Sequence, residues 1–478
     1  MKMKRFIEGV DRNQSTLFPE RLEDFIAEDN PVRVVDVFVD QLDLRELGFW
    51  GIDPSATGRP AYHPSQLLKL YIYGYLNRIP SSRRLERETQ RNIELMWLIE
   101  RLSPDFKTVA DFRKDNGPAI RRVCREFVVL CRRLDLFSQA IVAIDGSKFK
   151  AVNNRDKNFT SAKMKRRMEQ IEKSIDRYLG QLDSADREAP SIAEAKTSRL
   201  KDKIAVLTEE MQRLRRIEAQ MLESPDQQIS LTDPDARSMK TRGNGIVGYN
   251  VQTAVDVENH LIVSHEVINS GSDRGQLSNM AKQAQDAMGA EYLSAVADRG
   301  YFKGEEILAC DEAGIEVTLP KPQTSSGQAA GRFGKRDFQY VPEDDEYLCP
   351  AGERLIWRMT TQERGRTLHR YWSSTCPRCS IKDRCTPSPQ RRVTRWEHEE
   401  VLEAVQARLD RDPDKMRLRR QTAEHPFGTL KIWMGYTHFL TRTLPKVRTE
   451  MSLQVLSYNL KRAINLLGVG VLLDAIQA

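Results

Sequence analysis

Long hydrophobic runs are missing from this sequence. Its 478 residues contain no uninterrupted apolar stretch of the roughly 18 or more residues that indicate a membrane-spanning helix. Residues 1–14 are basic but lack the apolar segment of a secretory signal. We therefore expect a protein without a membrane-spanning segment that works in the cytoplasm.

A strong charge bias is missing as well. Lysine and arginine number 75 and aspartate and glutamate 68, which gives a formal net charge of +7. This excess suits a polyanionic partner, but many soluble enzymes carry as much, so charge alone does not identify the partner. Hydrophobic residues at 40% and charged residues at 30% are ordinary for a globular protein, and the length allows two or three domains.

Residues 1–137 are predicted to form a mostly helical domain. Three amphipathic stretches are expected to be helices: residues 64–77, 81–102 and 119–134. Arginine pairs accompany them, among them Arg83 and Arg84. Short helices joined by tight turns, with basic pairs on them, fit a DNA-binding domain. The alternative is a helical bundle whose arginines are merely solvated.

Strand character begins after this region. Residues 139–152 are β-branched and end in polar residues, as a buried strand with a functional carboxyl end does. Residues 248–269 predict a β-hairpin that turns near Glu258 and Asn259. The expected elements that follow are a helix at 275–288, a strand at 293–298, a helix at 303–313 and a strand at 315–321. Strands interleaved with helices indicate an α/β layer architecture with a mixed sheet, begun by residues 138–321.

Two insertions interrupt this predicted core. Residues 161–222 carry apolar residues at alternating steps of four and three, with a break near Ala189 and Pro190. This heptad pattern favours two antiparallel helices in one chain, and a dimerising coiled coil is the competing interpretation. The second insertion, residues 322–400, opens with a Gly- and Ser-rich basic stretch. Residues 401–478 return to helix and are expected to complete the core.

Three carboxylates stand out as candidate catalytic residues. Asp145 and Asp298 each end a predicted strand, and Glu424 lies on a basic predicted helix. The carboxyl ends of strands line the crevice where ligands bind in α/β sheets, so the two aspartates can converge there. Neighbouring carboxylates repel one another, and a divalent cation such as Mg²⁺, which prefers oxygen ligands, relieves that repulsion. Such ions suit phosphodiester chemistry.

Two other acids compete with these candidates. Asp256 ends the first strand of the predicted hairpin, and Glu450 lies on a later predicted helix. Asp256 falls next to the hairpin turn, which favours a turn role. Glu450 lacks the basic residues that surround Glu424, so we prefer Glu424.

The order of motifs resembles the DDE transposases of bacterial insertion sequences. The motifs AIDGSK, GYNVQTAVD and AVADRGY, followed by R-x3-E-x6-K, carry the likeness. The leading region from LFPERLEDFI through GRPAYHPSQLLKLYIYGYLN to FKTVADFRKDN is also similar to that family's usual first domain. The likeness therefore covers nearly the whole chain.

This resemblance implies a ribonuclease-H-like core in which Asp145, Asp298 and Glu424 hold two Mg²⁺ or Mn²⁺ ions. Arg420 and Lys431 match the basic positions of the family's Tyr-Arg-Glu-Lys signature and are expected to contact DNA. The signature tyrosine is replaced by Arg417, and an arginine can stack and bind phosphate. The implied partners are double-stranded DNA, as terminal inverted repeats and target, and a second copy of the chain. A bacterial protein acting at the nucleoid is expected.

A cluster of four cysteines requires a separate explanation. An unexported protein works in a reducing compartment, so disulfides are not expected. The cluster lies within the second insertion and comprises Cys349, Cys376, Cys379 and Cys385. Four thiolates suit a structural Zn²⁺ site, and their spacing also fits an iron–sulfur cluster; free cysteines without metal are the third alternative. Cys124 and Cys131, one heptad apart, are expected in the core.

The leading hypothesis is a transposase that cuts and joins DNA at the ends of its own element. A metal-dependent nuclease or resolvase of the same fold is the second hypothesis. An inactive DNA-binding regulator is the third, and the intact set of three acids argues against it.

Overall fold

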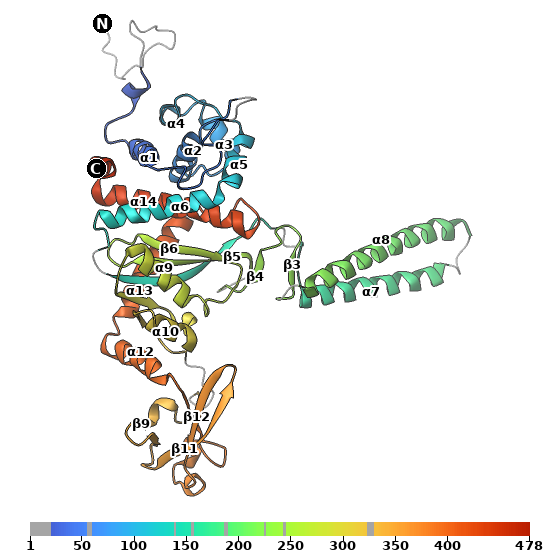
Figure 1. Ribbon diagram of the computed structural model, residues 1–478. Helices are drawn as coiled ribbons and strands as arrows, with labels where there is room; N and C mark the ends of the chain where they lie inside the picture. Colours follow the sequence, from blue (N-terminus) through green and yellow to red (C-terminus); the bar gives the residue numbers. More distant parts are fainter. Residues whose placement is uncertain are drawn as a thin grey trace, which may run out of the picture.

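The computed structural model describes residues 21–54, 60–137, 140–153, 157–185, 190–223, 226–241, 245–322 and 329–478. The basic residues 1–14 and the start of the Gly- and Ser-rich stretch after residue 322 lie outside these ranges. Helices at the N-terminus, a central sheet, a projecting helical hairpin and a small outlying sheet make up the molecule (Figure 1). Within the described residues no helix is long and apolar enough to cross a membrane.

The N-terminal region is helical, as predicted. Its elements are a 3₁₀ turn η1 (Leu22–Phe25), α1 (Pro31–Asp40), α2 (Pro64–Leu76), α3 (Ser82–Glu88), α4 (Ile93–Leu98), α5 (Phe106–Asp115) and α6 (Gly117–Arg133). Helices α2 and α6 confirm the stretches at 64–77 and 119–134. The prediction of one helix over 81–102 is wrong. The Asn92 side chain accepts a hydrogen bond from Leu95 N and starts a new helix, and Glu100 and Arg101 adopt positive φ angles of 54° and 59°.

These helices do not stand apart from the rest of the chain. Buried side chains of α1, α2 and α6 share one hydrophobic core with the long C-terminal helix α14 (Leu444–Leu467) and with the sheet. Cys124 and Cys131 lie in this core, as predicted. Figure 1 shows α6 and α14 side by side between the N-terminal helices and the sheet. The first and last parts of the sequence therefore fold as one unit.

The central sheet confirms the mixed α/β prediction. Its main strands are β1 (Ile141–Lys150), β5 (Ile246–Asp256), β6 (Ile262–Ile268), β7 (Leu293–Ala297) and β8 (Ile315–Thr318), with β4 (Arg237–Met239) beside the start of β5. The spatial order is β6-β5-β1-β7-β8, with β6, β5 and β1 antiparallel and β1, β7 and β8 parallel. Three antiparallel strands followed by two parallel ones in this order form a ribonuclease-H-like core.

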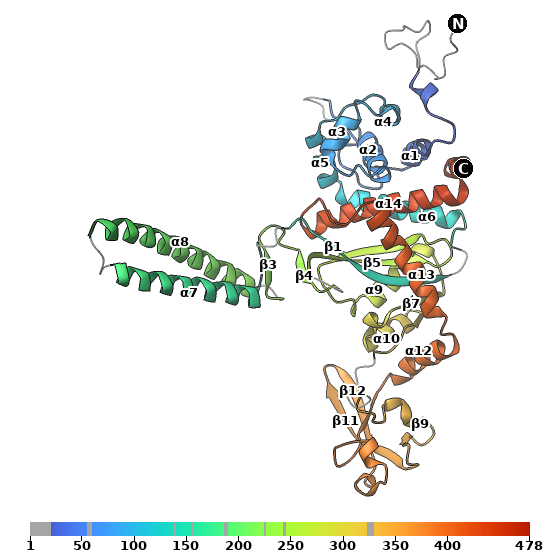
Figure 2. The same cartoon turned by 180° about the vertical axis from the view of Figure 1, so that it is seen from behind.

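Helices cover both faces of the sheet. Helix α9 (Leu277–Met288) packs on the face that carries Val142 and Ile144, and α10 (Gly304–Asp311) joins it there. Helix α13 (Lys415–Gly428) packs on the other face, where Ala423 meets Ala143 and Val296 (Figure 2). Consecutive residues of β1 thus alternate between the two faces, as strand geometry requires. The remaining C-terminal helices are α12 (Glu399–Arg411) and α15 (Val469–Gln477).

The first insertion is a helical hairpin within one chain. Helices α7 (Ser161–Ala185) and α8 (Pro190–Glu223) project from the sheet, and the short strands β2 (Asn158–Thr160) and β3 (Gln228–Ser230) pair at their base (Figure 1). Side chains such as Met164, Ile171 and Met211 form a separate small core between the helices. Helix α8 begins at Pro190, at the predicted break, which confirms the intramolecular hairpin.

The second insertion is a five-stranded antiparallel sheet. It comprises β9 (Gln339–Val341), β10 (Glu346–Leu348), β11 (Arg354–Glu363), β12 (Arg366–Trp372) and β13 (Val393–Trp396). Short 3₁₀ turns carry parts of its connections: η4 (Lys335–Asp337), η5 (Cys376–Arg378) and η6 (Lys382–Arg384). The sequence patterns had given no strands here, because β9, β10 and β13 have only three or four residues and the longer β11 is mostly exposed.

Candidate active site

Asp145 and Asp298 lie at neighbouring strand positions on one face of the sheet. In the parallel pairing of β1 with β7, Ile144 stands opposite Ala297, so the next residue of each chain segment is one of the two aspartates. Neighbouring strands lie about 4.8 Å apart. Both side chains point to the face of the sheet on which α13 packs, because Asp145 and Asp298 lie two residues after Ala143 and Val296 on that face. The fold therefore brings together two residues that are 153 positions apart in the sequence.

The Asp145 carboxylate is largely buried and crowded by other acids. Burial raises its pKa to about 6, partly opposed by Arg419 and by the Gly146 N–H, while Asp298 and Asp273 raise it further. Arg419, on α13, places its guanidinium 2.6 Å from Asp145 Oδ1, and the Gly146 N–H donates to the same oxygen at 2.8 Å. Arg419 is thus the counter-charge that keeps a buried carboxylate compatible with the fold.

Asp273 is a neighbour that the sequence patterns missed. It lies after β6, and its Oδ1 accepts hydrogen bonds from Asn250 Nδ2 and Gln252 Nε2, each at 2.7 Å, while Lys148 Nζ lies 3.3 Å away. A Cβ atom added at Gly146 would come within 2.4 Å of Gln252 Nε2 and 2.8 Å of the same Asp273 oxygen, so a larger residue there would displace these side-chain ends. The sequence around Asp273 shows only an acid in a short polar loop. Its position is set by the hydrogen bonds from Asn250 and Gln252 of β5.

Helix α13 presents two different faces beside the aspartates. Ala423 and Arg419 face the sheet, whereas Glu424 is exposed. Arg417, Arg420 and Glu424 follow steps of three and four residues, so they share one exposed stripe of the helix. Arg417 adds an ion pair to Asp414 at 3.6 Å.

Lys431 reaches the end of β1 from the turn after α13. Its Nζ donates to Ser147 Oγ at 2.6 Å and to the Lys148 carbonyl at 3.0 Å, and it lies 4.4 Å from the centre of the Phe149 ring. Burial lowers the pKa of Lys431, and the nearby Asp145 opposes this shift. The structure therefore brings Asp145, Asp298 and Lys431 together, with the α13 stripe beside them.

The rival acids serve the fold. Asp256 Oδ2 accepts hydrogen bonds from Glu258 N at 3.2 Å and Asn259 N at 2.6 Å, which is a hairpin-turn role. The buried Glu450 side chain accepts from the backbone N–H groups of Leu440 and Thr441. Asp256 and Glu450 thus both accept hydrogen bonds from backbone N–H groups of turns. These structural roles favour Asp145, Asp298 and Glu424 as the candidate catalytic acids.

The arginines predicted in the N-terminal region lie elsewhere. Arg83 and Arg84 are exposed on α3, which packs against α5. The Arg83 guanidinium stands over the Phe106 ring, 5.0 Å from its centre. These two arginines form a small basic surface on the N-terminal helices. No described contact joins them to Asp145 or Asp298.

The described side chains do not form a complete metal site. Among them, no group of three or more His, Cys, Asp or Glu residues is arranged so that it could hold a metal ion. Asp145 and Asp298 nevertheless suit a divalent cation, because a buried, crowded carboxylate with a raised pKa gains from an added positive charge. Glu424, which is exposed, would complete the set by moving its side chain toward them.

The four clustered cysteines gather at one end of the small sheet. Cys349, Cys376, Cys379 and Cys385 line one small cavity. Burial raises the pKa of the Cys385 thiol, with Arg391 opposing this and the other three thiols adding to it. The predicted proximity of the four residues is therefore present, although their arrangement is not that of a formed metal site.

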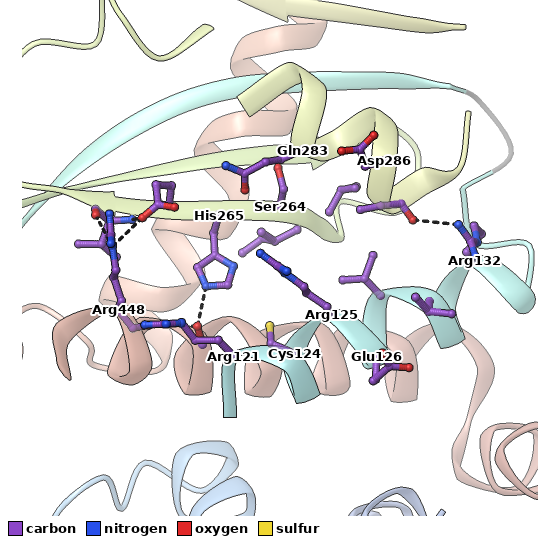
Figure 3. Close-up of a pocket in the computed structure, with 18 residues that line it drawn as sticks. Arg121, Cys124, Arg125, Glu126, Arg132, Ser264, His265, Gln283, Asp286 and Arg448 are labelled. Carbon is purple, nitrogen blue, oxygen red and sulfur yellow. Dashed lines mark hydrogen bonds and ion pairs between the residues drawn. The ribbon is translucent and has the colours of Figure 1, made fainter. Parts of the chain in front are cut away.

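A separate cavity of about 560 Å³ lies between α6 and β6 (Figure 3). There His265 Nε2 lies 2.9 Å from Ser452 Oγ, and burial, together with Arg125 and Arg121, lowers the His265 pKa to about 4. Arginines and acids both line this cavity, and the three candidate catalytic acids do not.

Two stretches of the chain match models of known protein families. Residues 20–115 match a family model described as a transposase domain (DUF772), and residues 348–464 match one described as a transposase DDE domain. No curated protein matches the chain. A solved piggyBac transposase synaptic complex with hairpin DNA aligns over 94% of this chain and 79% of that chain, with 8% identity and a TM-score of 0.30.

Both family models describe transposases, and the sheet order is the one expected for their catalytic core. The two matches support a DDE transposase of the insertion-sequence type.

Proposed function

We propose that the protein binds the ends of its element and catalyses metal-dependent cleavage and strand transfer of DNA phosphodiester bonds. The observation that carries this proposal is the placement of Asp145, within β1, beside Asp298, directly after β7, on the face of the sheet that α13 covers. Two carboxylates on one face of the sheet, one of them buried with a raised pKa, form the arrangement that phosphoryl transfer with divalent cations requires.

The proposal gives each residue a separate task. Asp145, Asp298 and Glu424 would hold two Mg²⁺ or Mn²⁺ ions, which activate the attacking water or 3′-hydroxyl and stabilise the departing oxygen. Arg419 holds the Asp145 carboxylate in place. Lys431 orients the end of β1 through Ser147 and the Lys148 carbonyl. Positioning and charge do most of the work in this chemistry.

DNA contacts are proposed at two places. Arg417 and Arg420, exposed along the α13 stripe, would bind phosphates next to the cut. Arg83 and Arg84, exposed on α3, would contact the element end from the helical region of residues 1–137. Residues 138–321 and 401–478 would form the catalytic core, with residues 322–400 as its insertion. Cutting two ends of one element also calls for a dimer.

Substituting Asp145→Asn tests the proposal. The variant should lose cleavage and strand transfer of a donor DNA that carries the inverted repeats, because a neutral amide is a poor ligand for a divalent cation. Binding to the DNA ends should stay within about twofold, since the phosphate contacts lie on other residues. Gel-based cleavage and strand-transfer assays with Mn²⁺ or Mg²⁺ measure the first effect and a mobility-shift assay the second.

Asp256→Asn is the matched control. Asp256 also lies in a strand of the sheet and also has a pKa raised by burial to about 6, but it bonds to a turn. An asparagine retains the oxygen that accepts from Asn259 N, so cleavage should persist. Retained cleavage in Asp145→Asn would refute the proposal. Cleavage without joined products would instead indicate a nuclease or resolvase, and DNA binding without cleavage by the unmodified protein a regulator.

A further inference from the structure

The cavity of about 560 Å³ between α6 and β6 has a cationic side. Arg121 and Arg125 reach it from α6, and Arg448 reaches it from α14. Figure 3 shows these three side chains gathered around His265 of β6. A cavity of this volume is large enough for a small molecule. We call Arg121, Arg125 and Arg448 the arginine cluster.

Two members of the arginine cluster form no ion pair within the described part of the chain. Arg448 Nε lies 2.8 Å from Glu266 Oε1 and also donates to the Val267 carbonyl at 3.1 Å. Among the described residues, no carboxylate stands within ion-pair distance of Arg121 or Arg125. These two arginines therefore bring two positive charges to the cavity that no carboxylate contacts directly.

The pKa values of two groups show that these positive charges lie close together. Burial lowers the pKa of Arg121, and Arg448 and Arg125 lower it further. The Glu266 carboxylate opposes this shift only in part. Burial also lowers the pKa of His265 to about 4, and Arg125 and Arg121 add to that shift. The guanidinium groups thus repel one another, and an anion between them would relieve the repulsion.

The rest of the lining is apolar or lies away from the arginine cluster. Val128 and Val263 line the cavity and are buried. The acids Glu126 and Asp286 line it as well, but both are exposed, and Figure 3 shows them away from His265. The cavity therefore combines a cationic end with an apolar wall.

These features select a phosphate group as the ligand of the arginine cluster. The planar guanidinium group matches two phosphate oxygens at once. A phosphate monoester carries about 1.5 to 2 negative charges at pH 7, which balances Arg121 and Arg125. A carboxylate, or each phosphodiester of a DNA backbone, carries only one. The apolar wall suits the organic part of such a molecule.

We propose that the cavity between α6 and β6 binds a small phosphate monoester through the arginine cluster. The phosphate group lies between the three guanidinium groups, and Val128 and Val263 pack against the body of the molecule. The site is separate from the candidate active site, because β5 lies between β6 and the strand β1 that carries Asp145. Its walls come from α6, the sheet and α14, so a bound ligand joins the first and last parts of the chain to the sheet. The proposal does not depend on the proposed function.

Binding of inorganic phosphate to the full chain tests this site. Radiolabelled phosphate is dialysed to equilibrium against the protein, without DNA and without divalent cations, so that metal ions at the candidate active site do not contribute. Wild type should show one saturable site, and 5′-AMP should displace the label. Arg125→Gln should weaken phosphate binding by about tenfold or more, because a hydrogen bond between charged groups is lost.

Melting curves with and without phosphate provide a second measurement of the same site. A ligand that binds only the folded state raises the melting temperature, so phosphate should stabilise wild type and leave Arg125→Gln nearly unchanged. Arg121→Gln should respond as Arg125→Gln does. Without phosphate, Arg121→Gln should melt no lower than wild type, because the substitution removes a charge that Arg448 and Arg125 repel.

Arg133→Gln is the matched control, because Arg133 is an exposed arginine of the same helix that does not line the cavity. It should bind phosphate as wild type does. The proposal is overturned if wild type shows no saturable binding, or if Arg121→Gln and Arg125→Gln both bind as tightly as wild type. Displacement of the label by a DNA duplex without terminal phosphates would also overturn it, because the arginine cluster would then be a contact for the DNA backbone. None of these measurements requires cleavage, so they decide this proposal whether or not the proposed function holds.

Discussion

At the scale of single residues, the burial of the Asp145 carboxylate lowers the stability of the fold but suits the binding of a divalent cation. Its carboxylate is largely buried next to Asp298 and Asp273, and a single guanidinium, from Arg419, opposes the repulsion. Glu424 is exposed on the neighbouring helix. A site of this kind trades folding stability for affinity toward a divalent cation. The cost should be measurable in the protein without metal.

The stability of the metal-free protein should depend on pH through Asp145. Its folded pKa of about 6 lies above the ordinary aspartate value of 3.8. Because its pKa is raised in the folded state, Asp145 contributes its full share to the free energy of unfolding below pH 4, and this share is lost as the pH rises through about 6. Relative to Asp145→Asn, wild type should therefore lose on the order of 2 kcal/mol between pH 4 and pH 8. Urea unfolding in chelator at both pH values measures this.

The comparison between two pH values removes the constant cost of leaving Arg419 without its partner in the variant. Adding Mn²⁺ at pH 8 should then stabilise wild type and leave Asp145→Asn nearly unchanged, because binding to the folded state alone raises stability. A pH dependence identical in the two proteins would show that Asp145 is not the group that titrates.

At the scale of elements, the small sheet has too little core to account for its own order. The hydrophobic cluster at its centre has five buried residues: Phe338, Tyr347, Leu355, Tyr371 and Val393. Small folding units with so few buried side chains usually need a disulfide or a metal. The four clustered thiols lie against this core, at Cys349 and Cys385 directly. Binding of Zn²⁺ would draw them together, since metal binding and local folding are coupled.

We predict about one Zn²⁺ per chain, held by the cysteine cluster. The double variant Cys376→Ser/Cys379→Ser should lose the metal, and its small sheet should become sensitive to protease, because the CxxC pair supplies two of the four thiolates. Elemental analysis and limited proteolysis measure the two effects. Cys310→Ala, which changes a buried cysteine of α10, is the control and should keep its zinc.

Iron in place of zinc, with the visible absorption of an iron–sulfur cluster, would contradict this prediction while keeping the cluster as the ligand set. A protein free of metal when purified with and without added zinc would contradict both. In that case the four thiols would be free cysteines packed against the Phe338 and Tyr347 core.

At the scale of the whole molecule, the α7–α8 hairpin has a hydrophobic core of its own. We therefore expect it to contribute little to the stability of the remaining fold. Its core is its own, and its base is the antiparallel pair of β2 and β3, in which Thr160 stands opposite Gln228. Removing residues 161–227 and joining the two strands through a short Asn-Gly turn should leave the remaining fold intact, because that turn suits an adjacent antiparallel pair. The main unfolding transition should shift by only a few degrees.

Circular dichroism melting and size-exclusion chromatography of the shortened chain test this separation. Its spectrum should lose helix in proportion to the two helices removed and otherwise match wild type. A shift from dimer to monomer would show that the hairpin mediates association, and global unfolding would show that its core supports the catalytic sheet.

Much of this architecture could be predicted from the sequence because it depends on local patterns. β-branched residues located β1, the strand pattern of residues 248–269 located the β5–β6 hairpin, and the heptads located α7 and α8 with their break near Pro190. The position of Asp298 directly after β7 followed from the same patterns. The prediction that Asp145 ends its strand is wrong, because β1 continues to Lys150 through its pairing with β5. Motif spacing alone selected Glu424. Where short-range signals conflict, as over residues 81–102, one capping side chain at Asn92 outweighed the helical pattern.

Only the tertiary structure decided which side chains face one another. The pairing of Arg419 with Asp145 and the place of Asp273 under Gly146 depend on strand register and on how α13 lies across the sheet. Burial and charge are set by neighbours distant in the sequence, so no local pattern contains them. Asp145 thus could be named from its motif, but its raised pKa and its arginine partner follow from packing.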